Sequence, residues 1–171
     1  MVHIYCGDGK GKTTAAMGLA LRGAGRGLGV VVAQFLKSED TGERRALAQV
    51  PGVVLLPLPE RVKFSFQMDE TDRREASERF TALCDRCQAL AAAGEVRMVI
   101  LDEVCAAVNT GLLPLERVLA LLDAVPAETE VVLTGRDPHP ALLDRADYVT
   151  EMKKIRHPYE KGVRARVGIE F

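Results

Sequence analysis

The sequence predicts an α/β fold with a mostly parallel central sheet and helices on both faces. Short apolar runs alternate with segments of helical periodicity, which is typical of βαβ units. The first apolar run leads into the glycine-rich segment 7–13 (GDGKGKT), and a helical pattern follows directly. The chain of 171 residues is long enough to bury one full core. We therefore expect one domain, spanning residues 1–171.

The first half of the chain contains three expected strands and two expected helices. The strands are at 2–6, 29–35 and 53–56, and the helices at 12–26 and 42–49. Residues 29–35 are almost continuously apolar, as expected for a strand that helices cover on both sides. The stretch 57–68 shows no clear periodicity, and loops of this length in compact domains often carry function. A functional loop is therefore expected there.

The second half of the chain continues the same alternation. Helices are expected at 69–93 and 114–125, and strands at 97–101, 130–134 and 147–151. In the helix 69–93 apolar residues recur at spacings of three and four, and Gly94 ends it. Pro114 is expected as the first residue of its helix, where its missing N–H costs nothing. The basic, irregular tail 153–171 is expected to fold over the sheet.

Composition and charge exclude several classes of protein. A hydrophobic fraction of 47% and a charged fraction of 27% are ordinary for a globular protein. A net charge of -1 gives no overall attraction to nucleic acid or to an anionic membrane, so neither is an expected partner. No run approaches the roughly 18 apolar residues of a membrane span, and the run 2–6 is too short for a signal peptide. Cys84 and Cys87 lie on the apolar side of a helical pattern, which predicts buried, reduced thiols and a cytoplasmic protein.

The glycine-rich segment predicts a phosphate-binding loop. The consensus is glycine, four residues, then Gly-Lys-Ser/Thr; here the first position holds Cys6, and Gly7 follows it. Glycines at 7, 9 and 11 still let the backbone N–H groups converge on phosphate oxygens, and the following helix directs its positive end at them. The fold is therefore predicted to be P-loop NTPase-like (RecA-like). The residues expected to bind the nucleotide here are Gly7, Asp8, Gly9, Lys10, Gly11, Lys12, Thr13 and Thr14.

A second acidic element follows the apolar run that precedes Asp102 and Glu103. In phosphate-loop proteins an acid at the end of a strand reaches a divalent metal directly or through water. We expect Thr13 together with Asp102 or Glu103 to hold Mg²⁺ or Mn²⁺. Either carboxylate can be the ligand. A hydrolase would use the same pair, so this element does not identify the reaction.

Several segments together resemble the P-loop ATP:corrinoid adenosyltransferases, also called cob(I)yrinate a,c-diamide or cob(I)alamin adenosyltransferases. They follow the family's order along the chain at 7–16 (GDGKGKTTAA), 34–37 (QFLK), 41–44 (TGER), 64–66 (FSF), 101–103 (LDE), 134–136 (TGR), 157–159 (HPY) and 168–171 (GIEF). The family's loop resembles GNGKGKTT, whose first glycine falls one place late, as Gly7 does here. The resemblance covers nearly the whole chain.

The resemblance implies a reaction in which a reduced cob(I) centre attacks C5′ of ATP and the whole triphosphate leaves. Lys12 would then stabilise a leaving group whose charge grows in the transition state. The resemblance also implies an aromatic pair, Phe64 and Phe66, that displaces the lower cobalt ligand and so eases reduction. The second position of the pair is often Trp in the family. With Lys12, these two aromatic residues are the expected catalytic residues.

The resemblance places further residues and partners near the nucleotide. Arg22, Gln34, Lys37 and Arg136 are the remaining expected ATP-binding residues. The family suggests a homodimer and an electron donor such as a flavoprotein. Many members carry a helix before the first strand that covers the corrinoid; with the first strand at Val2, this cover is expected to be absent or to come from elsewhere. The acceptor can be cobalamin, cobinamide or a cobyrinate intermediate.

Two other functions fit parts of the sequence. An ordinary P-loop ATPase or nucleotide kinase would release phosphate or a phosphorylated product instead of tripolyphosphate. A non-catalytic carrier of adenosylcobalamin would bind the corrinoid tightly without turnover. His157 is expected to be a surface or tail residue, with a place in the site as the alternative. Motif order along the chain favours the transferase.

Overall fold

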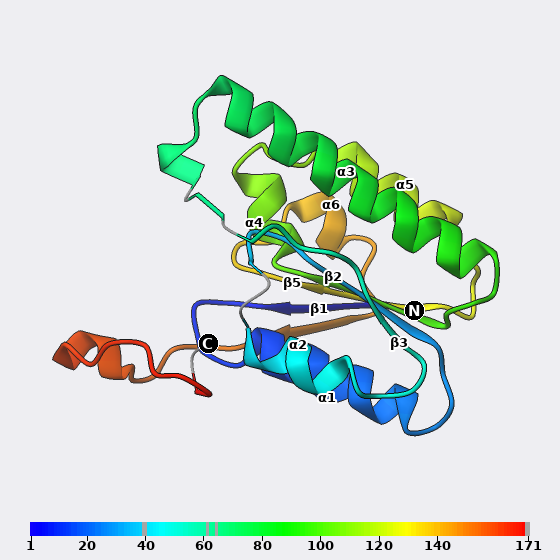
Figure 1. Cartoon of the computed structure of the whole chain (residues 1–171), viewed down its shortest axis with the longest axis horizontal. Helices are drawn as coiled ribbons and strands as arrows, with labels where there is room; N and C mark the ends of the chain where they lie inside the picture. Colours follow the sequence, from blue (N-terminus) through cyan, green and yellow to red (C-terminus); the bar gives the residue numbers. More distant parts are fainter. Residues whose placement is uncertain (39–40, 61, 64, 170–171) are drawn as a thin grey trace.

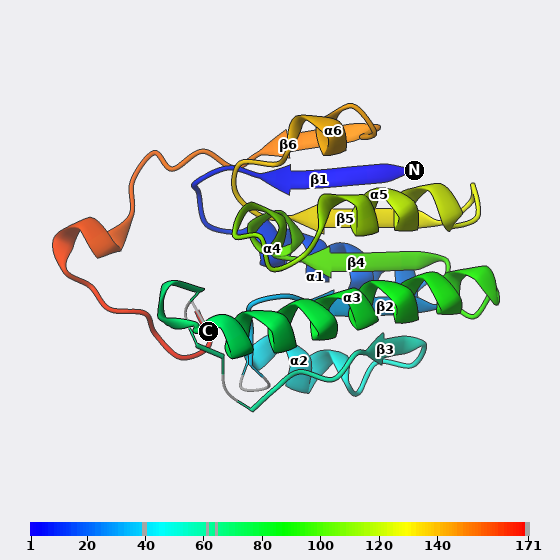
Figure 2. The same cartoon turned by 90° about the horizontal axis from the view of Figure 1, so that it is seen from above.

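The computed structural model describes residues 1–38, 41–60, 62–63 and 65–169. Six strands form one sheet in the order β3-β2-β4-β5-β1-β6 (Figure 2). They are β1 (Val2–Cys6), β2 (Val30–Gln34), β3 (Val53–Leu55), β4 (Met98–Asp102), β5 (Glu130–Thr134) and β6 (Tyr148–Glu151). Every neighbouring pair is parallel, so the sheet is parallel throughout. All carboxyl ends therefore meet at one edge.

Helices cover both faces of this sheet (Figure 1). One face carries α1 (Lys12–Ala24) and α2 (Gly42–Leu47). The other carries α3 (Glu70–Ala92), α4 (Val104–Asn109), α5 (Leu115–Ala124) and α6 (Pro140–Leu143). Two short 3-10 helices, η1 (Ser65–Gln67) and η2 (Pro158–Lys161), complete the elements. The predicted α/β fold class is confirmed.

The core explains why the central strands are apolar without interruption. Successive side chains of a strand point to opposite faces of the sheet. In β4, Val99 and Leu101 pack beneath α3 and α5, whereas Met98 and Ile100 belong to the cluster beside α1. Since both faces are covered, the positions before the strand's last residue, Asp102, are all apolar. No helix within the described ranges is long and apolar enough to cross a bilayer.

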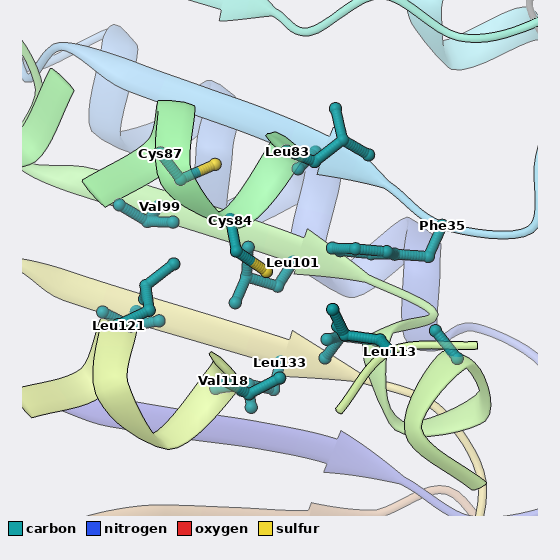
Figure 3. Close-up of a cluster of buried hydrophobic side chains, with 14 of the residues drawn as sticks. Phe35, Leu83, Cys84, Cys87, Val99, Leu101, Leu113, Val118, Leu121 and Leu133 are labelled. Atoms are coloured by element: carbon teal, nitrogen blue, oxygen red, sulfur yellow. The ribbon is translucent and has the colours of Figure 1, made fainter. Parts of the chain in front are cut away.

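The cysteine pair of α3 lies in this core, as Figure 3 shows. Cys84 and Cys87 are at most 1% exposed and carry free thiols. Burial raises the pKa of the Cys84 thiol to about 12, so it stays protonated at neutral pH. The prediction of buried, reduced thiols is confirmed.

The structure corrects several details of the predicted elements. Helices α4 and α6 were not expected, because six and four residues are too few to show helical periodicity. Pro114 is the N-cap residue of α5 rather than its first helical residue. The expectation that the tail folds over the sheet is wrong. Residues 158–169 are all exposed and extend beyond the carboxyl edge (Figures 1 and 2), because charged side chains are costly to bury.

Candidate functional site

A cleft of about 1390 Å³ opens at the carboxyl edge of the sheet. The loop residues 8–14 form one wall, and Lys37, Glu103 and Arg136 project from the ends of other strands. Ligands of open parallel sheets bind at this edge. The volume exceeds the roughly 300–1,000 Å³ of a typical small-molecule site, so the cleft has room for more than one ligand.

The phosphate loop is held in place by the chain that follows β6. Gly9 donates its N–H to the carbonyl oxygen of Met152 at 2.6 Å, and Lys154 donates its N–H to Asp8 Oδ1 at 2.8 Å. That second bond lowers the pKa of the Asp8 carboxyl below its usual value. A Cβ on Gly7 would lie only 2.5 Å from the same Met152 oxygen. The glycines therefore serve the packing of the loop as well as access to phosphate.

Lys12 lies at the centre of the loop. Its side chain is 8% exposed, and Nζ donates to the carbonyl oxygens of Gly7 at 2.7 Å and Gly9 at 2.8 Å. Gly11 precedes it with a left-handed φ of 114°, which brings the start of α1 against the loop. The first N–H groups of a helix have no partner within the helix. An ammonium group and several free N–H groups thus meet where a polyphosphate would lie.

Asp102 binds four side chains from three segments of the chain at the floor of the cleft. Its side chain is completely buried. Oδ1 accepts hydrogen bonds from the hydroxyls of Thr13 at 2.9 Å and Thr134 at 2.7 Å. Oδ2 accepts from Gln34 Nε2 at 3.2 Å and pairs with Lys37 Nζ at 2.8 Å. A carboxylate offers about four lone-pair directions, and here all are used.

Lys37 adds a positive charge to this floor. Its Nζ also lies 3.2 Å from Thr13 Oγ1 and 3.4 Å from Glu43 Oε1. Burial alone would lower the pKa of Lys37, but Asp102 and Glu43 outweigh it, and the pKa lies above its ordinary value. The ammonium group is therefore charged throughout the physiological range.

Gln34 is fixed from both sides of its amide group. Nε2 donates to Glu43 Oε1 at 3.0 Å, while Oε1 accepts from Arg44 Nη1 at 3.2 Å. Arg44 is 6% exposed and also donates from Nη2 to the carbonyl oxygen of Leu56 at 2.9 Å. Helix α2 and Leu56, the residue just before the stretch 57–68, are thereby tied to the buried polar floor.

Glu103 lines the cleft next to the buried Asp102. It has a left-handed φ of 62°, rare for a residue with a side chain, and its N–H donates to Thr134 Oγ1 at 2.8 Å. Burial, followed by the neighbouring charge of Asp102, raises the pKa of its carboxyl. The contact between the Thr13 hydroxyl and Asp102 supplies the hard oxygen ligands that Mg²⁺ prefers. Metal binding therefore fits these residues, although the described residues contain no group of three or more His, Cys, Asp or Glu side chains arranged as a metal site.

Most of the residues predicted for the site come together. The loop, Thr13, Gln34, Lys37, Asp102, Glu103 and Arg136 meet at the carboxyl edge. His157, expected at the surface, also lines the cleft. Arg22 is not among the residues that line the cleft: it is exposed in the last turn of α1, although the preceding residue Leu21 does line the cleft.

The predicted aromatic pair is only partly described. Phe64 lies outside the described residues. Phe66 belongs to η1 and is 80% exposed, while its neighbour Ser65 lines the cleft. The loop therefore borders the cleft with a large aromatic side chain at its surface.

Sequence reasoning missed several residues that build the floor or hold the loop, including Thr134, Glu43 and Met152. Thr134 is the polar end of a predicted strand, a signal that could have identified it. Glu43 follows a glycine in the TGER segment, without a pattern that indicates a contact with Gln34. Met152 acts through its backbone carbonyl, which no side-chain pattern reveals.

Comparison with known proteins gives consistent matches. The family model described as ATP:corrinoid adenosyltransferase BtuR/CobO/CobP matches residues 1–171. The corrinoid adenosyltransferase of Pseudomonas aeruginosa is 36% identical over 98% of this chain and 82% of its own length. Corrinoid adenosyltransferase CobA of Salmonella typhimurium is 37% identical over 100% of this chain and 85% of its own length. A solved structure of a KaiC-like protein from Pyrococcus horikoshii is similar over 99% of this chain and 66% of that chain, with 16% identity and a TM-score of 0.46.

Proposed function

This chain belongs to the ATP:corrinoid adenosyltransferase family, and we propose that it transfers the 5′-deoxyadenosyl group of ATP to the cobalt of a reduced corrinoid, releasing triphosphate. One observation carries the proposal: the loop around the buried Lys12 forms one wall of a cleft of about 1390 Å³. A nucleotide held at that wall leaves room in the cleft for a second, larger substrate.

The cationic groups of the site suit a leaving triphosphate. The cobalt centre donates an electron pair to C5′, the C5′–O bond breaks, and the bonding pair stays on the triphosphate oxygen. Lys12, Lys37 and the N–H groups at the start of α1 stabilise the charge that develops there. A cobalt(I) nucleophile carries no proton, so the reaction needs no general base. Positioning and electrostatics supply the rate.

A divalent metal belongs to this proposal as a cofactor. Thr13 with Asp102, or Glu103 at the cleft surface, would hold Mg²⁺ or Mn²⁺. The ion would contribute positive charge to the triphosphate. The position of the Asp102 carboxylate is fixed in advance, because it is bonded to four side chains.

The stretch 57–68 is the proposed corrinoid-binding loop. Lys63 and Ser65 line the cleft beside the phosphate loop, which supports a position for this stretch next to a bound nucleotide. Phe64 and Phe66 would form the apolar floor that displaces the lower cobalt ligand and eases reduction. The proposal includes a flavoprotein-type electron donor, a homodimer and a cytoplasmic location.

Glu103 supports one second candidate, an ordinary P-loop ATPase. A cleft carboxyl with a raised pKa can accept a proton from an attacking water molecule. The two functions differ in their products. ATP hydrolysis releases inorganic phosphate, whereas adenosyl transfer releases tripolyphosphate and forms a cobalt–carbon bond.

The test is incubation of the protein with ATP, Mg²⁺ and chemically reduced cobalamin. Loss of the cob(I) absorption band reports adenosylation, and phosphorus NMR identifies the phosphate product. We expect adenosylcobalamin and tripolyphosphate in equal amounts. Inorganic phosphate without cobalt alkylation would favour the ATPase. Tight corrinoid binding without turnover would indicate a carrier.

A further inference from the structure

The ammonium group of Lys37 occupies an unusual position for a nucleotide-binding lysine. It lies 2.8 Å from Asp102 Oδ2, 3.2 Å from Thr13 Oγ1 and 3.4 Å from Glu43 Oε1. These oxygens come from β4, α1 and α2. A hydroxyl and two carboxylates form a hard oxygen set of the kind that binds a divalent cation. Lys37 thus stands between the residues that fit the metal.

The backbone directs Lys37 into this position. Strand pairing continues to Phe35, whose N–H donates to the carbonyl oxygen of Asp102 at 2.8 Å. The next residue, Leu36, has a left-handed φ of 56°. Such a conformation is unfavourable for a residue with a branched side chain and persists only where the surroundings enforce it. The turn at Leu36 sends Lys37 back over the end of the sheet, where its side chain is 21% exposed.

We propose that Lys37 is a tethered cation that holds the place of the divalent metal and moves onto the triphosphate when the metal binds. A buried Asp102 carboxylate without a positive neighbour is strongly unfavourable, so some cation must accompany it. The metal ion and the ammonium group need the same oxygens of Asp102 and Thr13 and repel each other. Since Lys37 lines the cleft, phosphate oxygens are the natural acceptor for the displaced ammonium group.

This exchange couples the two ligands of the site. Metal binding releases Lys37 for the phosphates, and phosphate binding withdraws Lys37 from the metal site. Linkage requires that each ligand favours the other by the same factor, which for coupled sites is about 5–150-fold. Lys37 therefore makes the nucleotide-free protein a poor metal binder.

The test measures Mn²⁺ binding to the protein without nucleotide or corrinoid, from the electron paramagnetic resonance signal of free Mn²⁺. Lys37→Met should bind Mn²⁺ about tenfold more tightly than the wild type, a change within the usual range for coupled sites. Lys153→Met removes an exposed lysine that does not line the cleft and should leave the affinity unchanged. The added change Asp102→Asn in Lys37→Met should abolish the gain.

Three results would overturn the proposal. The first is an unchanged Mn²⁺ affinity in folded Lys37→Met. The second is an equal gain in Mn²⁺ affinity in Lys153→Met. The third is a gain in Mn²⁺ affinity that persists when Asp102→Asn is added to Lys37→Met. If Lys37→Met does not fold, the displacement is tested in the wild-type protein by labelling with an amine reagent. Mn²⁺ should increase the labelling of Lys37, measured by mass spectrometry with Lys153 as the reference. Unchanged labelling at saturating Mn²⁺ would refute the displacement.

The proposal rests on the metal site of the proposed function and not on cobalt chemistry. Failure of adenosyl transfer with normal Mn²⁺ exchange would reject the transferase alone. Normal adenosyl transfer with no effect of Lys37→Met on Mn²⁺ affinity would reject the exchange alone. The two failures are therefore distinguishable.

Discussion

Thr134→Val tests whether the buried polar floor holds the carboxyl edge together. The substitution keeps the shape of the side chain and removes only its hydroxyl group. Two bonds are lost: the 2.7 Å bond donated to Asp102 Oδ1 and the 2.8 Å bond accepted from the N–H of Glu103. Thr134 is completely buried, so water does not replace either partner. The variant should therefore be strongly destabilised.

The expected loss follows from these two bonds. A hydrogen bond to a charged group contributes about 1.5–3 kcal/mol, and a buried N–H left without a partner costs about 1–3 kcal/mol. Together they predict a fall of about 2.5–6 kcal/mol in the free energy of unfolding. With an m-value of about 2 kcal/mol/M, the urea midpoint should fall by about 1.2–3 M. Urea unfolding followed by circular dichroism measures both quantities.

Thr129→Val is the matched control. Thr129 is 2% exposed, and its hydroxyl has no hydrogen-bond partner among the residues that the structure describes. Removing a buried, unpaired hydroxyl should leave the free energy of unfolding unchanged or raise it by about 1 kcal/mol. Equal midpoints for the two variants would refute the argument. So would a loss below about 0.5 kcal/mol in Thr134→Val, which is the size of an ordinary surface substitution.

Three further predictions concern the reaction and the charge of the cleft. Lys12→Ala should abolish tripolyphosphate release with an unchanged circular dichroism spectrum, because the leaving group loses its principal cation; wild-type rates would contradict this. Phe64→Ala should slow turnover of cob(II) under mild reduction far more than turnover of prereduced cob(I), and equal losses in both assays would reject the aromatic floor. Because the pKa of Glu103 is raised, the folded protein binds this proton more tightly than the unfolded chain does. At pH values above the ordinary glutamate pKa of about 4.3, the ionised carboxylate therefore lowers the free energy of unfolding. Glu103→Gln should therefore raise the free energy of unfolding, relative to wild type, at pH 7 but not at pH 4; an equal difference at both pH values in urea unfolding would contradict it.

Much of the fold and site could be predicted because their physical signals are local. The strand before Gly7 and the helix from Lys12 identify the phosphate loop, since only a strand, a turn and a helix in that order place an ammonium group and free N–H groups together. Asp102 follows an apolar strand, and parallel strands end at one edge. Lys37 and Arg136 follow strands in the same sense, and both line the cleft.

The remaining features depend on contacts that the sequence does not encode locally. The tail extends beyond the sheet because the cost of burying its basic residues exceeds the gain from burying its few apolar ones. Composition alone does not show which of these two free energies is larger. Met152 holds Gly9 through a backbone carbonyl, and any residue type has one. Arg22 is assigned to the site by its position in the family's sequence. Such a match does not show where its side chain lies, and the structure places Arg22 in the last turn of α1.

The arrangement around Asp102 explains how a small domain can keep a charged site rigid before its ligands arrive. One buried carboxylate is bonded to α1 through Thr13, to the end of β2 through Gln34, and to β5 through Thr134. A shift of any one segment would leave a buried charge with an unfilled bond, which is far more costly than the bond itself contributes. The segment after β2 is the exception, because Lys37 reaches Asp102 with a flexible side chain that can move without the backbone. The site therefore combines a fixed anion with a cation on a flexible side chain, and in the proposed exchange a phosphate chain takes this cation without disturbing the fold.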